Sequence, residues 1–460
     1  MNSIGNQVQK IIFSSLIFFI CMFFVVGSNP LIIIFHILAL LLFESSRNQA
    51  QQILFVLLGV FIPTSIAIAN FLIGGLVLCW ILEWIVFFWI SVFPRYAWYD
   101  HLQSENFKGN FLKKISQIKE SKWMLSIFGL IGLYALGLCW GDNHLNAEWQ
   151  FQRLALLLVF PIFITTEFKQ KTINRAVIAF LGTAFISALI ALAININIIN
   201  PLGEYFSFIG ISHNSAFIKY NYHNVILALA STLCLYILIE RKSKYRYLLL
   251  FFLLIYALSI FTEAGRAGQV IFNLSVVFYV FYYNRKHFLR LCALLLLLFS
   301  FQFIVYKSTK VYKNRFDALS NIIQNNGSIG GGKLEDIRYV FVKESLDQII
   351  KNPILGYGTG SFGTIFKNEV KSGHVFNTHT TPHNQYLYVW FELGILGLLL
   401  LLSIFFHQIR ELFKKKDGIH RILLPLSFMF LMLIDSYFFI FILTSCYIFL
   451  FTIYTKYQQE

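Results

Sequence analysis

The stretch from His383 to Gly397 reads HNQYLYVWFELGILG. A polar His-Asn pair stands at the start of an apolar run, in which two glycines, Gly394 and Gly397, would let a neighbouring helix approach closely. A transmembrane helix needs roughly 17–25 predominantly apolar residues, so the sequence predicts a membrane-spanning helix over 384–406. A histidine at the point where such a helix meets water is a candidate for chemistry, because ionisable groups are costly in this setting.

The rest of the chain is also rich in apolar residues and poor in charged ones. Its 460 residues are 57% hydrophobic and 13% charged, whereas soluble domains carry about 25% charged residues. We therefore predict an all-α fold, a polytopic integral membrane protein with about 12–14 transmembrane helices and one large, partly helical extracytoplasmic loop. The candidate spans are approximately 11–27, 30–44, 53–69, 72–93, 122–140, 149–166, 174–195, 223–240, 246–261, 267–283, 287–306, 384–406, 422–436 and 438–456.

The net charge of +15 follows mostly from membrane topology. With the N-terminus placed in the cytoplasm, most of the 37 Lys and Arg fall in predicted cytoplasmic segments, as the positive-inside rule requires. The same placement puts the C-terminus in the cytoplasm. The sequence therefore favours membrane lipids as a partner and argues against nucleic acid.

Three blocks follow one another along the chain. Residues 1–306 form a first transmembrane block, 307–383 an extracytoplasmic loop, and 384–460 the last transmembrane helices with a cytoplasmic tail. Within the loop, apolar residues recur at helical spacing over 334–350, which predicts an amphipathic helix. The cytoplasmic stretch 94–121 is polar and basic and is expected to be a surface loop.

Four cations lie where topology does not explain them. Arg153, Lys219 and Arg266 fall on short outer segments, and Arg338 projects near the apolar face of the amphipathic helix. Glycines flank Arg266 and would let a large anion approach its guanidinium, whose planar fork can bind two phosphate oxygens at once. The alternative for these cations is contact with lipid headgroups.

His383 is the candidate general base, because an imidazole changes its protonation near neutral pH. Asn384 beside it would fix the ring orientation, and His379 is a second candidate nearby. Two acidic residues in or beside the late spans are also functional candidates. Helix-to-helix hydrogen bonding explains Glu392 equally well, and Asp435 is interpreted as marking the outer turn between the last two helices.

No metal site and no cofactor are predicted. All six cysteines lie inside predicted spans and are interpreted as packing residues. His213 and His223 have no carboxylate or cysteine cluster beside them, which argues against zinc. The segment 327–333 (GSIGGGK) fits the spacing of a phosphate-binding loop, but Leu334 replaces the Ser or Thr that would hold Mg²⁺, so we interpret it as a flexible hinge.

Taken together, these motifs resemble the bacterial O-antigen ligase superfamily, which also contains O-antigen polymerases and O-linked oligosaccharyltransferases. The resemblance rests on Arg338, on PILGYGTGSFG at 353–363, on the stretch 383–397 and on Arg266 with its neighbouring glycines. Family members often carry an Arg shortly before a Gly-x-Phe element. The corresponding region here, 212–219, has none, so a histidine or Lys219 would supply that contact.

The resemblance implies a metal-independent, inverting glycosyltransferase of the bacterial inner membrane, with its active site at the periplasmic face. The donor would be a glycan on undecaprenyl pyrophosphate, and the acceptor a sugar hydroxyl of lipid A–core. The catalytic residues would be His383 as base, with Arg266 and Arg338 at the diphosphate. The substrate-binding residues would be Arg153, Lys219, His223, Asn384 and His379.

Three alternatives remain. An O-antigen polymerase would use the same donor with a second lipid-linked glycan as acceptor. A protein O-oligosaccharyltransferase is expected to carry a larger soluble C-terminal region than this tail. A secondary transporter is favoured only by the number of spans, since transporters place their polar residues near the membrane midplane, whereas here they gather at one face.

Overall fold

The computed structural model describes residues 44–92, 105–141, 144–201, 216–240, 245–309, 313, 317, 328–329, 334–335, 337–369 and 381–457. The first helices are α3 (Glu44–Phe61), α4 (Ile66–Val92), α5 (Glu105–Glu120), α6 (Lys122–Leu136), η2 (Gly137–Cys139), α7 (His144–Leu154), η3 (Ala155–Leu158), α8 (Val159–Thr165) and α9 (Gln170–Asn195). The middle elements are α11 (Tyr220–Glu240), α12 (Arg246–Thr262), α13 (Arg266–Asn284), α14 (Phe288–Ser308), β1 (Ser328–Ile329), β2 (Leu334–Glu335), α16 (Ile337–Lys351) and α17 (Phe362–Glu369). The last are α18 (Gln385–Phe413), α19 (Gly418–Arg421), α20 (Leu423–Ile434), η6 (Tyr437–Phe439) and α21 (Phe441–Lys456).

The chain is an all-α polytopic membrane protein, as its composition predicts. In the described part of the chain, seven helices are long and apolar enough to cross a membrane, and three shorter apolar helices accompany them. The seven are Ile66–Phe88, Lys122–Cys139, Ala147–Thr165, Gln170–Asn195, Tyr220–Ile239, Phe288–Ser308 and Gln385–Phe413. The predicted span 11–27 and all of the predicted span 30–44 except its last residue lie outside the described residues, so the total of about 12–14 stays a prediction.

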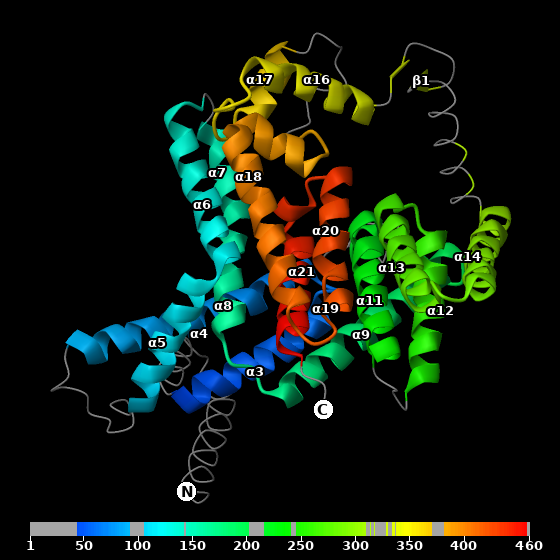
Figure 1. Cartoon of the computed structure of the whole chain (residues 1–460), viewed down its shortest axis with the longest axis horizontal. Coiled ribbons are helices and arrows are strands. Elements are labelled where there is room, and N and C mark those ends of the chain that lie inside the picture. The colour runs from blue at the N-terminus through cyan, green and yellow to red at the C-terminus, as the bar shows by residue number, and fades with distance from the viewer. Residues whose placement is uncertain are drawn as a thin grey trace, which may run out of the picture.

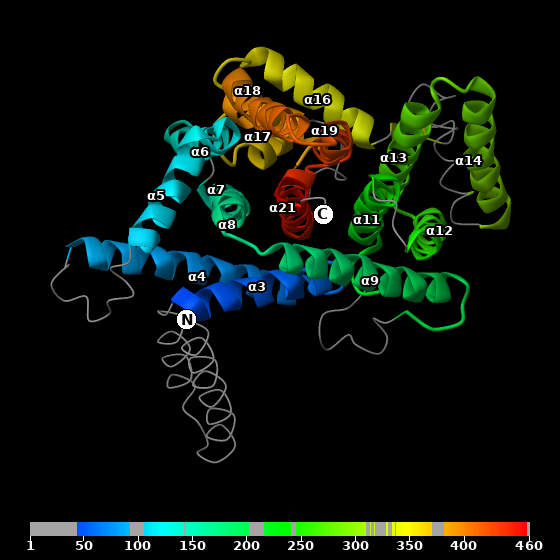
Figure 2. The same ribbon diagram turned by 60° about the horizontal axis from the view of Figure 1, so that its bottom comes forward.

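One predicted span, 53–69, is two helices in the structure. α3 ends at Phe61 and α4 begins at Ile66, with Pro63 between them. Proline has no N–H to donate, and its ring clashes with the preceding turn, so the helix stops there. The two helices then pack against each other, and α3 also packs along α9. Figure 2 shows α3, α4 and α9 as one layer across the rest of the molecule.

The stretch 94–121 was expected to be a surface loop, but most of it is the helix α5. Phe111 on this helix is buried and stacks on Phe87 of α4, with the ring centroids 3.8 Å apart. Lys114 forms a close ion pair with Glu83 of α4, at 2.6 Å. These two contacts with α4 stabilise α5 as a helix, because tertiary packing of an amphipathic face supplies most of the stability of a helix in a protein.

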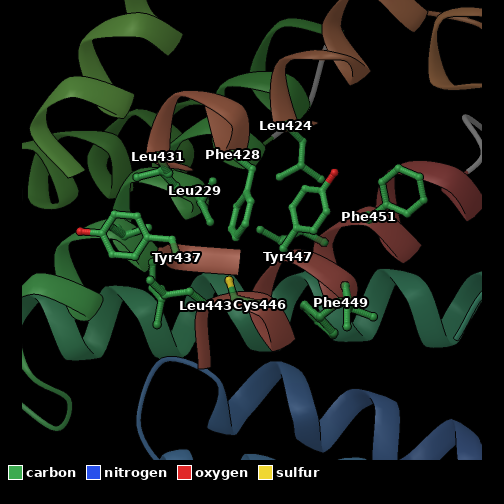
Figure 3. Close-up of a cluster of buried hydrophobic side chains, with 14 of the residues drawn as sticks. Leu229, Leu424, Phe428, Leu431, Tyr437, Leu443, Cys446, Tyr447, Phe449 and Phe451 are labelled. Atoms are coloured by element: carbon green, nitrogen blue, oxygen red, sulfur yellow. The ribbon is translucent and has the colours of Figure 1, made fainter. Parts of the chain in front are cut away.

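α21 lies at the centre of the fold (Figure 1). Its side chains are buried from Ile442 to Tyr454, and they pack against α20 and α11 in the cluster drawn in Figure 3. The Phe428 ring of α20 stacks on Tyr447 at 4.4 Å. A span that is hydrophobic all round is therefore buried in protein here, where composition alone cannot distinguish it from a lipid-facing helix.

The predicted amphipathic helix in the loop 307–383 is α16. Before α16, the strands β1 and β2 pair antiparallel, with Ser328 opposite Glu335 and Ile329 opposite Leu334. This pairing brings together the two ends of the segment 327–333, which was interpreted from the sequence as a hinge. α16 packs on α18, and Figure 1 shows α16 and α17 at the top, above α18 and α20.

Candidate functional site

The centre of the site is a hydrogen bond between His383 and Asp435. His383 Nδ1 lies 3.0 Å from Asp435 Oδ1, and the two side chains are 28% and 19% exposed. An ionised carboxylate only accepts hydrogen bonds, so this contact places the hydrogen on Nδ1 and the basic lone pair on Nε2. The pair therefore has the arrangement of a general base held by a carboxylate.

Local structure brings these two residues together. Asn384 is the N-cap of α18, and its Oδ1 accepts the backbone N–H groups of Tyr386 and Leu387 at 3.0 and 3.1 Å. Its Nδ2 donates to the carbonyl oxygen of Leu433, in the last turn of α20, at 3.3 Å. Asn384 was predicted to orient the ring of His383. The structure places it as a helix cap that ties α18 to the end of α20, beside the ring.

His383 itself has a left-handed backbone conformation, with φ of +52°. This conformation is uncommon for a residue other than glycine. It stands one residue before the N-cap, so the chain turns sharply into α18 and carries the imidazole toward the end of α20. The ring also packs against Phe341 of α16, at a centroid distance of 5.6 Å. Helix α16 therefore contributes to the site.

Arg153 lies within electrostatic reach of this pair. Its guanidinium lies near Tyr388, Tyr222 and Asp435, and it lies over the ring of Trp149 one turn earlier on α7. The structure thus places Arg153 within electrostatic reach of Asp435, the partner of His383. A cavity shared by these residues stays a prediction.

A buried contact joins α7 to α18 at the same level. Tyr388 of α18 donates its hydroxyl to Gln150 Oε1 of α7 at 3.0 Å, and both side chains are buried. Buried hydroxyl and amide groups need such partners in a medium without water. This contact fixes the helix that carries Arg153 relative to the helix that follows His383.

His223, predicted to bind substrate, lies in the interior. Its side chain is fully buried. Its Nδ1 is 2.8 Å from Glu263 Oε1, and its Nε2 is 2.8 Å from Ser187 Oγ. Both ring nitrogens are therefore engaged by protein groups in this conformation. His223 joins α9 and α11 to the turn before α13.

Arg266 is the first residue of α13, directly after that turn. Its neighbours Gly265 and Gly268 were interpreted as giving an anion room to approach. The structure shows a different reason for them: a Cβ at either position would overlap Asn224 of α11. The glycines serve the close packing of α13 on α11, and the side chain of Arg266 is half-buried at the end of this contact.

The structure says less about the other predicted site residues, Lys219, Arg338 and His379. Lys219 is exposed just before α11. Arg338 belongs to α16, but its side chain lies outside the described residues, as does the whole of His379. Among the described residues, no group of three or more His, Cys, Asp and Glu side chains could hold a metal ion. The roles of these residues stay predictions.

The glycine-rich segment Pro353–Ser361 is built into the membrane helices. The N–H of Gly358 donates to the carbonyl oxygen of Glu392 in α18 at 2.8 Å, and the N–H of Thr359 donates to that of Gly137 at 3.1 Å. The Glu392 carboxylate is fully buried and accepts the N–H of Gly360 at 3.1 Å. Glu392 was left open between function and structure. Its contact with the segment supports the structural role.

α18 is broken where this segment crosses it. Gly394 has φ of +65° inside the helix, and a Cβ there would overlap the carbonyl oxygen of Ile354. Gly394 was expected to let a neighbouring helix approach, but the neighbour is this irregular segment. Irregular backbone at membrane depth is tolerated where protein buries it.

Two residues that the sequence did not single out contribute to the arrangement: Tyr222 lies near Arg153 and Asp435, and Glu263 holds His223. Asp435, which was interpreted as marking a turn, holds His383. The sequence contains one signal for the two carboxylates, since each ends an apolar helix where a charge is costly. The partner of each carboxylate is far away in the chain, so pairing could not be deduced from local pattern.

One comparison with known proteins gives a match. A family model described as O-antigen ligase matches residues 251–402. No curated protein matches the chain. The matched segment runs from within α12 to within α18, so it includes Arg266, the glycine-rich segment and His383.

Proposed function

We propose that the protein is a membrane glycosyltransferase of the ligase type, because residues 251–402 match the family model described as O-antigen ligase. It transfers a glycan from undecaprenyl pyrophosphate to a sugar hydroxyl of lipid A–core. The reaction takes place at the periplasmic face of the bacterial inner membrane, with both chain termini in the cytoplasm. It needs no metal ion and no cofactor.

His383 acts as the general base in this proposal. A sugar hydroxyl is a poor nucleophile, so its proton must be taken up as the new bond forms. Asp435 holds Nδ1 at 3.0 Å and thereby leaves Nε2 as the nitrogen that receives the proton. The carboxylate also stabilises the imidazolium that results.

The acceptor oxygen forms a bond to the anomeric carbon while the bond from that carbon to the diphosphate oxygen breaks. The proton of the hydroxyl moves to His383, and the electron pair of the broken bond leaves with the undecaprenyl diphosphate. Attack from the face opposite the leaving group inverts the configuration at the anomeric carbon. The proton on His383 then passes to water.

Cations stabilise the charge that develops on the leaving diphosphate. We assign this role to Arg266 and Arg338, with Arg153 and Lys219 binding the substrate at the same face. Arg153 is the best supported of these, because it is half-buried and lies within electrostatic reach of Asp435. We assign His223 a positioning role, since its ring is fully buried.

The observation that carries the proposal is the partly exposed His383–Asp435 pair with an arginine in electrostatic reach. A base and a cation at one surface are the two groups that inverting transfer from a diphosphate requires. An O-antigen polymerase or a protein O-oligosaccharyltransferase would use the same chemistry with another acceptor, so the acceptor decides between them.

The test is the lipopolysaccharide of a deletion strain, separated on a gel. Loss of a ligase leaves full-length polymer on its lipid carrier, so the ladder of polymer-bearing lipopolysaccharide disappears. Loss of a polymerase leaves core capped with a single repeat, and an unchanged ladder contradicts both functions.

Complementation of the same strain tests the base. We expect His383→Ala to reach the membrane in normal amounts and to restore no ladder. His407→Ala, a histidine near the other end of α18, is the matched control and is expected to restore it. A normal ladder with His383→Ala would remove the base assignment.

A further inference from the structure

The same two-residue arrangement occurs twice in the fold. His223-Asn224 lies at the start of α11, and His383-Asn384 lies at the start of α18. In each pair, the histidine Nδ1 contacts a carboxylate, at 2.8 Å to Glu263 and 3.0 Å to Asp435. In each pair, the asparagine Nδ2 donates to a backbone carbonyl oxygen. The acceptors are Ile260, at 2.9 Å, and Leu433, at 3.3 Å.

The two carboxylates occupy equivalent positions. Glu263 is the C-cap of α12, and Asp435 is the C-cap of α20. The accepted carbonyl lies in the last turn of the same helix in each case. We call each set a His-Asn latch: the inner latch is His223, Asn224 and Glu263, and the outer latch is His383, Asn384 and Asp435. Each closes one end of a packed helix pair, α11 with α12 and α18 with α20.

The two latches differ in exposure. The ring of His383 is 28% exposed, whereas that of His223 is fully buried and its Nε2 is 2.8 Å from Ser187 Oγ. A ring without exposed surface does not reach a substrate hydroxyl. The role of the inner latch is therefore structural, and its contacts show which segment of the chain it fixes in place.

The inner latch holds the turn that leads to Arg266. Glu263 lies three residues before Arg266, and Asn224 packs against both Gly265 and Gly268. Gln269 closes the turn from the other side, because its Nε2 contacts the carbonyl oxygens of Ile260 and Glu263 at 3.2 and 3.3 Å. The backbone from which Arg266 projects is thus fixed from α11 and from α13.

We propose that His223 and Asn224 are positioning residues for Arg266. They fix the backbone of its turn so that the guanidinium meets the diphosphate of the donor. This inference rests on the proposed function for the identity of the ligand. In this proposal the outer latch orients the base, His383, and the inner latch orients the cation, Arg266. A displacement of about 1 Å at a reacting group costs up to about 100-fold in rate.

The first test measures transfer in purified protein with lipid-linked glycan as donor. We expect His223→Ala to lower kcat/KM for the donor about 10- to 100-fold, with little change in the KM for the acceptor. Thr232→Val is the matched control, because the Thr232–Ser275 hydrogen bond, at 2.7 Å, joins the same helices α11 and α13 deeper in the fold. This variant is expected to keep the wild-type kcat/KM for the donor.

A double mutant separates positioning from general stability. If His223 acts through Arg266, then adding His223→Ala to Arg266→Ala changes donor use by less than about 2-fold. Multiplicative losses in the double mutant would overturn the proposal. If His223→Ala does not reach the membrane, Ser187→Ala removes only the contact at Nε2, and the same comparison is made with it.

Hydrogen exchange gives a readout that does not depend on activity. We expect His223→Ala to speed amide exchange over residues 263–268, and Thr232→Val to leave that segment unchanged. Unchanged exchange in His223→Ala would overturn the positioning role even if activity falls. If the wild-type protein transfers no glycan, the proposed function fails, while the exchange data still decide whether the inner latch fixes the turn.

Discussion

At the residue scale, Asp435 converts an interfacial histidine into a defined base. A lone imidazole at the membrane surface can carry its hydrogen on either nitrogen. The contact of 3.0 Å between Asp435 and Nδ1 of His383 removes that choice. The same carboxylate oxygen also accepts the backbone N–H of Ser436 at 2.7 Å, which holds the carboxylate in place.

Asp435→Asn is therefore expected to lower kcat/KM about 10²- to 10⁴-fold. The amide keeps the size of the side chain, but it can donate to Nδ1 and so stabilise the wrong tautomer. Transfer assays on purified protein, with KM and kcat determined separately, check this expectation. Asp417→Asn is the control, since Asp417 lies in the turn between α18 and α19 and asparagine also tolerates its left-handed φ of +59°. Full activity in Asp435→Asn would show that His383 needs no carboxylate.

At the element scale, α18 is two helices joined at a glycine. The break at Gly394 makes room for the segment Pro353–Ser361, which hydrogen-bonds both to α18 and to Gly137 at the end of α6. The part of α18 before the break follows directly from His383. The glycine-rich segment therefore sets the position of the base relative to the membrane helices.

Gly394→Ala is expected to destabilise the protein by at least about 1–2 kcal/mol, from the left-handed conformation alone, and by more because the new Cβ would overlap Ile354. The thermal midpoint of detergent-solubilised protein measures the effect. Gly132→Ala is the control, because nothing lies within 4 Å of a Cβ at Gly132 in α6. Equal midpoints for the two variants would mean that the break in α18 is not required.

At the scale of the whole molecule, the site lies at one end of the helices. α16 and α17 cover that end, and the outer latch lies beneath α16 through the contact of His383 with Phe341. The opposite end carries α19, where Arg421 binds the carbonyl oxygens of Tyr454 and Tyr457 at the end of α21. Cations that bind the C-terminal ends of helices in this way also compensate the helix dipole.

The proposed topology predicts labelling from opposite sides of the membrane. In a variant without the six native cysteines, Ile350→Cys on α16 should react with a membrane-impermeant maleimide in intact spheroplasts, because Ile350 is 73% exposed. Lys416→Cys, in the turn after α18, should react only after permeabilisation. Labelling in the reverse order would place the site on the cytoplasmic side and contradict the use of a periplasmic acceptor.

The sequence by itself determined the fold class and the places where most helices lie. Local composition suffices for this, because a bilayer requires long apolar runs with internally satisfied backbone hydrogen bonds. Local pattern also singled out His383 and Arg266 as candidates, since ionisable groups at the ends of such runs are conspicuous, and their roles stay predictions. It failed at 53–69, where Pro63 separates two helices, and at 105–120, where a basic stretch is helical.

Only the tertiary structure decided which residues are partners. His383 meets Asp435 across 52 positions, and His223 meets Glu263 across 40. These contacts depend on which helix ends pack together, and one apolar helix looks much like another in composition. Packing also buried His223 and left His383 partly exposed, although an asparagine follows each of them. The same His-Asn sequence therefore has a structural role at one site and a proposed chemical role at the other.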